Sequence, residues 1–215
     1  MKIAILGGTG DEGFGLGFRW AAAGHEIIIG SRKAEKGLQA AADLLQKLPA
    51  GRVTGTDNAT AAAAADLAVL SVPYWAQEST LASLKEVLEG KLLITVVAPT
   101  GEKKSRVWRL PSGKSAAEEA QDLLGENARV VAAFQSIGAH HLTDPDFKID
   151  SDVLVCGDKG ADKQTVMQLC EDAGMRGVNA GALQNAIVAE GMVSVLIAIN
   201  IIHKVKSAGI RVTGI

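Results

Sequence analysis

The sequence predicts an α/β fold: a Rossmann-like, doubly wound and mainly parallel sheet with a small C-terminal helical part. From Met1 to about Ala139, short runs rich in Ile, Leu and Val alternate with helical segments, which is typical of a parallel sheet covered on both faces. The first run, Lys2–Leu6, passes through a glycine-rich turn into a helix, which is how a βαβ unit begins. These two observations carry the prediction of fold class.

The composition is that of a globular protein. The chain has 215 residues, of which 47% are hydrophobic and 21% charged, so one domain of ordinary α/β size can bury a core. The net charge of −2 and the 4% of aromatic residues give no reason to expect nucleic acid or an anionic membrane as a partner. No signal peptide is expected, and Cys156 and Cys170 are expected to be buried free thiols in a cytoplasmic protein.

Five strands are expected in the first half of the chain, with a helix after each of the first four. The strands are expected at Lys2–Leu6, Glu26–Ile29, Arg52–Thr56, Leu67–Ser71 and Leu92–Val97. The helices are expected at about 13–23, 34–48, 59–65 and 77–88. Gly24 is placed to end the first helix, and Pro49 closes the second because proline cannot continue a helix.

A basic loop, residues 101–113, leads into the second half. Ser115 and Glu118 form a capping box that starts a helix. The elements expected are helices at Ala116–Leu124 and about 163–173, strands at Val130–Ala133 and Val153–Cys156, a loop through 179–181 and a closing helix at about 184–208. The closing helix is apolar all round and is interrupted by Glu190, so we expect it to lie in the core or against a second subunit rather than to cross a membrane. A homodimer or higher homo-oligomer is therefore favoured.

The segment Gly8-Thr9-Gly10-Asp11-Glu12-Gly13 matches the pattern G-x-G-x-x-G. It follows a strand and opens a helix, and in this context the pattern indicates a dinucleotide site. Glycine permits the tight turn and lets the backbone approach a pyrophosphate, which then lies at the positive end of the helix.

The end of the second expected strand distinguishes NADP from NAD. An NAD site usually has Asp or Glu there to bind the ribose 2′-hydroxyl. This chain has Ser31 and Arg32 instead, with Lys36 one helical turn further on. A hydroxyl and two cations suit a 2′-phosphate, because Arg offers a planar fork to phosphate oxygens and Lys a point charge. The sequence therefore predicts NADP.

The other strand ends carry little acid–base chemistry. Tyr74 is the only tyrosine, and the residue four positions after it is Glu78, so the chain contains no Tyr-x-x-x-Lys pair. His140 and His141 are adjacent and in an extended segment would point to opposite faces, so no metal site is predicted. An oxidoreductase needs no proton donor when hydride passes between two redox cofactors, because the protein then supplies alignment alone. The scarcity of acid–base residues favours such a transfer.

A longer set of motifs runs through the chain, at Lys2–Lys36, Ala68–Pro73, Ser115–Glu118, Val155–Asp158 and Asn179–Leu183. In this order they resemble the NADPH-dependent coenzyme F420 reductases (F420H2:NADP oxidoreductases). The resemblance spans essentially the whole chain. It implies a Rossmann domain at residues 1–140 that binds NADP and a small C-terminal part at 141–215 that completes a cleft. It also implies reversible hydride transfer between NADP(H) and the deazaflavin coenzyme F420.

The resemblance further implies roles for single residues. For NADP these are Thr9, Gly10, Asp11 and Glu12 at the pyrophosphate, Ser31, Arg32 and Lys36 at the 2′-phosphate, and Tyr74, Glu78, Thr100 and Ala139 along the rest. Those implied to face the deazaflavin are Gln135, Ile137 and Ala208. The family pattern has His and Trp in place of Gln135 and Tyr74. The basic loop fits contacts with the anionic tail of the coenzyme as well as a plain solvated loop.

Two other functions fit the same residues. One is an NADPH-dependent reductase of another acceptor, such as a flavin, a quinone or an imine. The other is a non-catalytic module that senses NADP and signals through a partner.

Overall fold

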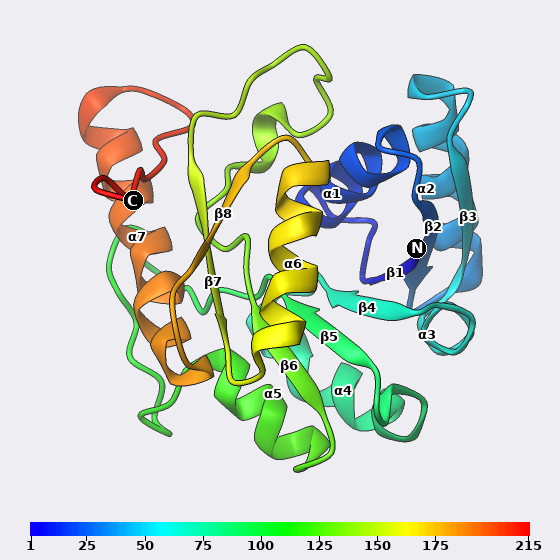
Figure 1. Ribbon diagram of the computed structural model, residues 1–215, viewed down its shortest axis with the longest axis horizontal. Coiled ribbons are helices and arrows are strands. Elements are labelled where there is room, and N and C mark those ends of the chain that lie inside the picture. Colours follow the sequence, from blue (N-terminus) through cyan, green and yellow to red (C-terminus); the bar gives the residue numbers. More distant parts are fainter.

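The computed structural model describes residues 1–215 and contains one sheet of eight strands (Figure 1). Their order is β3-β2-β1-β4-β5-β6-β7-β8. The strands are β1 Lys2–Leu6, β2 Glu26–Ser31, β3 Arg52–Asp57, β4 Leu67–Leu70, β5 Leu92–Thr95, β6 Arg129–Ala132, β7 Asp152–Gly157 and β8 Arg176–Asn179. All neighbours are parallel except β6 and β7. The predicted α/β class and the mainly parallel, Rossmann-like sheet are confirmed.

Helices cover both faces of this sheet. They are α1 Asp11–Ala22, α2 Ala34–Lys47, α3 Asn58–Ala64, α4 Tyr74–Leu88, α5 Ala116–Leu124, α6 Gly160–Asp172 and α7 Ala186–His203, with short 3-10 helices η1 Ala139–His141 and η2 Leu183–Asn185. Ile3 and Ile5 of β1 belong to a cluster of 29 buried residues that includes side chains of α1, α2 and α6. Ala4 and Leu6 point the other way, into a cluster of 22 buried residues with side chains of α3, α4 and α5. Burial on both faces explains why β1 is apolar throughout.

The strand β8 is not predicted from the sequence, and it overlaps the expected loop at 179–181 only at Asn179. The segment Arg176–Asn179 contains one β-branched residue and no alternation, so the pattern alone does not indicate a strand. Parallel pairing with β7 makes it one. The C-terminal part therefore adds two strands to the sheet besides its helices. Cys156 and Cys170 are buried free thiols, as expected.

The helix α7 also differs from expectation. It ends at His203, because Lys204 adopts a left-handed conformation with a φ of 54°, so the residues up to Ala208 lie outside it. The core covers only one side of α7: Ile201 and Ile202 are 65% and 71% exposed. The segment Leu183–His203 has the length and apolar composition of a membrane span, and 28% of it is buried.

Glu190 is the charged residue within α7, and it lies inside the protein, 3% exposed. Its carboxylate accepts the backbone N–H groups of Ala116 and Ala117 at 2.8 and 3.0 Å. Glu190 therefore caps the N-terminus of α5 from a neighbouring helix, since the first N–H groups of a helix have no partner within it. Burial raises the pKa of Glu190 to about 7.

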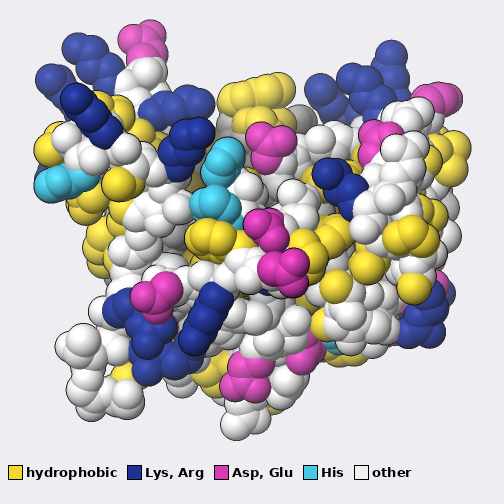
Figure 2. Space-filling model, turned by 90° about the horizontal axis from the view of Figure 1, so that it is seen from above, with side chains coloured by type: hydrophobic (Ala, Val, Ile, Leu, Met, Phe, Trp, Pro, Cys, Tyr) yellow, Lys and Arg dark blue, Asp and Glu magenta, His cyan; other side chains and the backbone are white.

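The surface charges are divided into groups. On the face seen in Figure 2, Lys and Arg side chains gather in separate groups, with hydrophobic and acidic side chains between them. Such groups on a chain of net charge −2 suit small anionic ligands rather than an extended polyanion.

Candidate dinucleotide and hydride-acceptor site

The turn after β1 depends on contacts that only glycine permits. Gly7 has a φ of +74°, in the left-handed region that favours glycine. A β-carbon on Gly8 would lie 2.8 Å from the carbonyl oxygen of Ile5, and one on Gly13 would lie 2.8 Å from Oγ of Ser71. These distances are shorter than β-carbons tolerate, so the glycines allow α1 to start directly against the ends of β1 and β4.

Gly10 is different, because nothing within the chain requires glycine there. Its φ of −85° suits any residue, and a β-carbon would have no atom within 4 Å. No side chain caps the helix α1 that follows, so its first N–H groups are free to bind a ligand. The open space beside Gly10 suits close approach of a pyrophosphate to the backbone.

A cavity of about 530 Å³ lies beside this turn, at the carboxyl ends of the strands. Five of the residues predicted to bind NADP line it together, namely Thr9, Gly10, Ser31, Arg32 and Lys36. Lys33 lines it as well, and no carboxylate does. None of its three cations forms an ion pair within the chain. The cavity therefore offers unpaired positive charge to an anion.

Two further residues of the cavity are not found by the sequence analysis. Asn58 accepts the Gly7 N–H with Oδ1 at 3.1 Å and so holds the glycine turn in place. The signal for Asn58 is its position just after β3, at the same edge of the sheet as the turn. Trp75 also lines the cavity and is 74% exposed. A large aromatic side chain left in solvent beside a cavity is suited to contact with a ligand.

Asp11 and Glu12 lie outside the cavity lining, in the first turn of α1. Asp11 is exposed. Glu12 has an Oε1 that is shielded from solvent and has no hydrogen-bond partner. Burial raises the pKa of Glu12 to about 8. Glu12 is therefore mostly protonated at neutral pH, and in this form it does not repel a pyrophosphate.

Tyr74 and Glu78 line a neighbouring cavity of about 500 Å³, which shares Trp75 with the first. The Tyr74 hydroxyl donates to Oε2 of Glu119 at 2.7 Å, and its ring meets that of Trp108 edge to face. Burial, followed by the hydrogen bond to Glu119, raises the pKa of Tyr74. The structure thus places these two predicted residues beside the cation-lined cavity rather than in it.

The residues predicted to face the acceptor follow β6. Phe134 has a φ of 72°, unusual for a non-glycine residue, and this turns the chain sharply at the end of the strand. Gln135 is 8% exposed and donates from Nε2 to the Thr95 carbonyl at 2.9 Å, so one of the two N–H donors of its amide is already used. Ile137 is buried, and Ala139 begins η1.

Thr100 and Ala208 come from two other segments. Thr100 pairs with Val107 in an isolated antiparallel bridge that encloses residues 101–106 of the basic loop. The Ala208 N–H donates to Oδ1 of Asn200 at 2.8 Å, after the end of α7. Its neighbour Ser207 lies beside Gly138, which places the C-terminal segment next to the loop that follows β6.

The two adjacent histidines do not lie in an extended segment, so the expectation of side chains on opposite faces does not apply to them. His140 and His141 lie in η1, a tight turn rather than an extended segment, and their rings are 4.9 Å apart. The ring of His141 stacks on Phe147 at 3.7 Å. The structure contains no group of three or more His, Cys, Asp or Glu side chains placed to hold a metal ion.

The fold and the cation-lined cavity define a Rossmann-type dinucleotide-binding protein. Residues 2–99 match the family model described as NADP oxidoreductase, coenzyme F420-dependent. F420-dependent NADP reductases of Methanothermobacter marburgensis and Methanocaldococcus jannaschii are each 41% identical to the chain and match 100% of it and 99% of their own length. The chain therefore belongs to the F420-dependent NADP reductase family.

The solved structures agree with this assignment. A candidate F420-dependent NADP reductase from Arthrobacter sp. FB24 superposes with a TM-score of 0.84 over 100% of both chains, at 26% identity. An imine reductase from Bacillus cereus superposes with a TM-score of 0.63 over 94% of this chain and 62% of its own, at 18% identity. The likeness to the imine reductase, at 18% identity, shows the fold alone.

Proposed function

We propose that this protein is an oxidoreductase that transfers a hydride reversibly between NADP(H) and coenzyme F420. The observation that carries the proposal is the set of three unpaired cations at the end of β2, lining a cavity next to the glycine turn. Full-length similarity to reductases named for these two cofactors supports it. The nicotinamide of NADP(H) would supply or accept the hydride.

The residues present fit NADP. The open space at Gly10 and the uncapped start of α1 suit the pyrophosphate, with Thr9 beside them. Ser31, Arg32 and Lys36 suit the 2′-phosphate, because they combine a hydroxyl, a planar fork of donors and a point charge. We propose the same role for these residues as the sequence predicts, with Lys33 added.

We propose direct transfer without a side-chain acid or base. The segment 135–139 reads Gln-Ser-Ile-Gly-Ala and contains no ionisable side chain. Gln135 is held by Thr95 and retains an amide oxygen that can accept a hydrogen bond. What the chain supplies is alignment of two ring systems and exclusion of water.

The measurement that tests this function follows the absorbance band of oxidised coenzyme F420 after mixing with NADPH and a catalytic amount of enzyme. Loss of the band is expected. No change would overturn the proposal. In that case, turnover of a free flavin, quinone or imine would identify another acceptor, and tight NADPH binding without any turnover would identify a sensing module.

We further propose a cytoplasmic homodimer, in which residues 1–140 bind NADP and residues 141–215 complete the cleft and contribute the subunit contact. The exposed apolar side of α7 supports this, since such a surface usually marks an interface. Ile201→Lys is expected to yield monomers in light scattering. Leu38→Lys, at a residue of α2 that is 57% exposed, is the matched control and should not. A monomeric wild-type protein would contradict the proposal.

A further inference from the structure

Arg19 of α1 contacts a segment that lies far away in the sequence. Its guanidinium donates hydrogen bonds to four backbone carbonyl oxygens, from Nε at 2.8 Å and from Nη2 at 3.0, 2.6 and 3.0 Å, and these belong in turn to Leu142, His141, Asp144 and Phe147. All four lie in the segment 139–151, which joins the loop after β6 to β7. Arg19 forms no ion pair within the chain, so its side-chain contacts serve this segment.

Gly15, one helical turn before Arg19, brings the backbone of α1 against the same segment. A β-carbon on Gly15 would lie 2.4 Å from Cβ of Leu142, which is closer than two such atoms tolerate. Leu142 is fully buried. Gly15 and Arg19 are four positions apart and therefore lie on one face of α1. This face of the helix packs directly on the segment 139–151.

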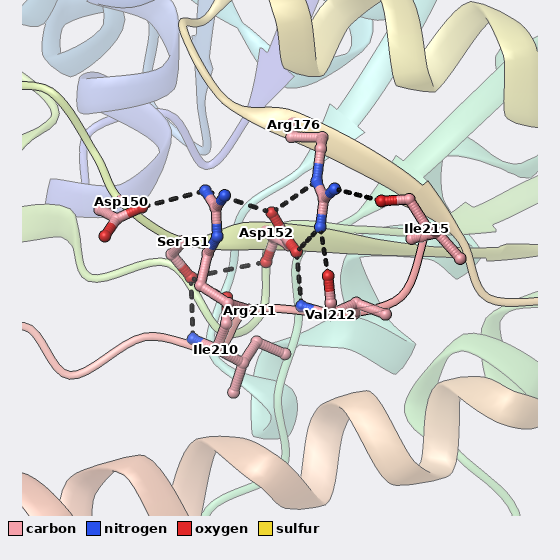
Figure 3. Close-up of polar contacts among 8 residues, drawn as sticks. All are labelled: Asp150, Ser151, Asp152, Arg176, Ile210, Arg211, Val212 and Ile215. Carbon is pink, nitrogen blue, oxygen red and sulfur yellow. Dashed lines mark hydrogen bonds and ion pairs between the residues drawn. The ribbon is translucent and has the colours of Figure 1, made fainter.

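The segment 139–151 is also held by contacts of its own. Its first part is a series of tight turns, in which three backbone N–H groups donate to the carbonyl oxygen three residues earlier, at 3.1, 3.2 and 3.3 Å. Its other end is fixed beside β7, as Figure 3 shows: Asp150 accepts a hydrogen bond from Arg211 at 3.0 Å, and Oγ of Ser151 accepts the N–H of Ile210 at 3.1 Å. The segment is therefore a firm support for α1 rather than a loose loop.

The two elements that Arg19 joins border the two halves of the candidate site. The proposed place of the pyrophosphate is the start of α1, and the loop 135–139 runs directly into η1. In the sheet, β1 and β6 are not neighbours, because β4 and β5 lie between them. The sheet therefore links the two halves only indirectly. Contacts from α1 link them directly, and the rings of Trp20 and Phe134, which meet edge to face at 5.6 Å, extend this junction into the core.

We propose that Arg19 and Gly15 are positioning residues for hydride transfer, which hold α1 on the segment 139–151 and so set the separation between the dinucleotide and the acceptor beside loop 135–139. The inference rests on the proposed function for the identity of the two cofactors. Reaction requires the reacting atoms to approach to about 3–3.5 Å, and a displacement of about 1 Å caused by a remote change can cost about a hundredfold in rate. Because the proposed mechanism uses no side-chain acid or base, this alignment is what the chain contributes.

Arg19→Lys tests the role of the guanidinium. Lysine keeps the positive charge but lacks the planar fork of donors that reaches several carbonyl oxygens at once. In a single turnover with both cofactors bound, the rate of hydride transfer from NADPH to F420 should fall by about tenfold or more, while the Kd values of NADPH and of oxidised F420 stay within about twofold. Deuterium at the transferred position of NADPH should slow this phase in both proteins, which identifies it as hydride transfer.

Gly15→Ala tests the same contact by a second route, because the added methyl group presses on Leu142 and moves α1 with the guanidinium intact. It should slow the same phase. Arg129→Lys is the matched control. Arg129 also donates to a carboxylate and to a backbone carbonyl, those of Asp162 and Gly90, but it lies at the opposite end of β6 from the acceptor loop. This control should leave the rate of hydride transfer and both Kd values unchanged.

A folded Arg19→Lys protein that transfers hydride at the rate of the wild type, or one in which only the Kd values change, would overturn the positioning role. A wild-type protein that reduces no F420 would overturn the proposed function instead. The same single-turnover measurement with the acceptor that the wild type does reduce would then still decide about Arg19.

Discussion

A β-carbon on Gly55 would lie 2.0 Å from the carbonyl oxygen of Gly37, so the backbone of α2 rests directly on β3. This contact fixes the first turn of α2, which places Lys36 at the cavity together with Ser31 and Arg32. The packing of Gly37 against Gly55 therefore determines where Lys36 of the candidate NADP site lies.

Gly55→Ala is expected to reduce the free energy of unfolding by about 1–3 kcal/mol, because α2 must move away from β3 to admit a methyl group. NADPH should also bind more weakly, as Lys36 moves with the helix. Urea unfolding and an NADPH titration measure the two effects. Gly160→Ala is the control, since a β-carbon there meets no atom within 4 Å and alanine favours the helix α6. Equal stability of Gly55→Ala and the wild type would refute the contact.

Arg32→Ala is expected to weaken NADPH binding by about 1–3 kcal/mol, the range for a lost charge-assisted hydrogen bond. NADH lacks the 2′-phosphate, so its affinity should hardly change. Titration of both dinucleotides measures the difference. Arg52→Ala, at the far end of β3 where Arg52 donates to the Gly24 carbonyl, should leave both affinities unchanged. Equal losses for NADPH and NADH would mean that Arg32 does not read the 2′-phosphate.

The sequence is informative where local chemistry decides the structure. The glycine turn, the strands β1, β2 and β4 and the cations at the end of β2 follow from hydrophobic runs, glycine spacing and charge, and the structure brings them together. Parallel strands end at one edge of the sheet, so residues that follow different strands become neighbours. This is why Thr9 and Arg32 could be assigned to one site.

Contacts between distant segments could not be predicted in this way. β8 becomes a strand through pairing with β7, and Asn58 acquires its role by accepting the Gly7 N–H from 51 residues away. The sequence of β8 has no local pattern that indicates a strand, and the position of Asn58 just after β3 indicates the sheet edge but not its partner Gly7. The same holds for Glu190, which the sequence shows as a charge in an apolar helix, while its partners lie at the start of α5.

Glu12 should make the stability depend on pH. Its pKa is about 8 in the folded protein, above the ordinary value of 4.5, so the folded state holds the proton more tightly than the unfolded state does. The contribution of Glu12 to stability is therefore fully present below about pH 4.5 and is lost as the pH rises through about 8.

The variant Glu12→Gln cannot ionise at this position. As the pH rises from about 4.5 to about 8, the wild type should therefore lose unfolding free energy relative to the variant. Urea unfolding at several pH values measures it. Asp11→Asn, at the exposed neighbouring residue, is the matched control variant. If the unfolding free energies of Glu12→Gln and the wild type change in parallel with pH, the pKa of Glu12 is not raised in the folded protein.

Glu190→Ala should destabilise the protein without altering its chemistry. The substitution leaves the N–H groups of Ala116 and Ala117 buried and unpaired, which costs about 1–3 kcal/mol. Glu190→Gln keeps one acceptor oxygen and should lose less. The exposed Glu86 of α4 gives the control Glu86→Ala, which should be nearly neutral. The Tm measures the loss, and the KM of NADPH should not change, since the cap lies outside the cation-lined cavity. A raised KM with unchanged Tm would instead place Glu190 in the binding site.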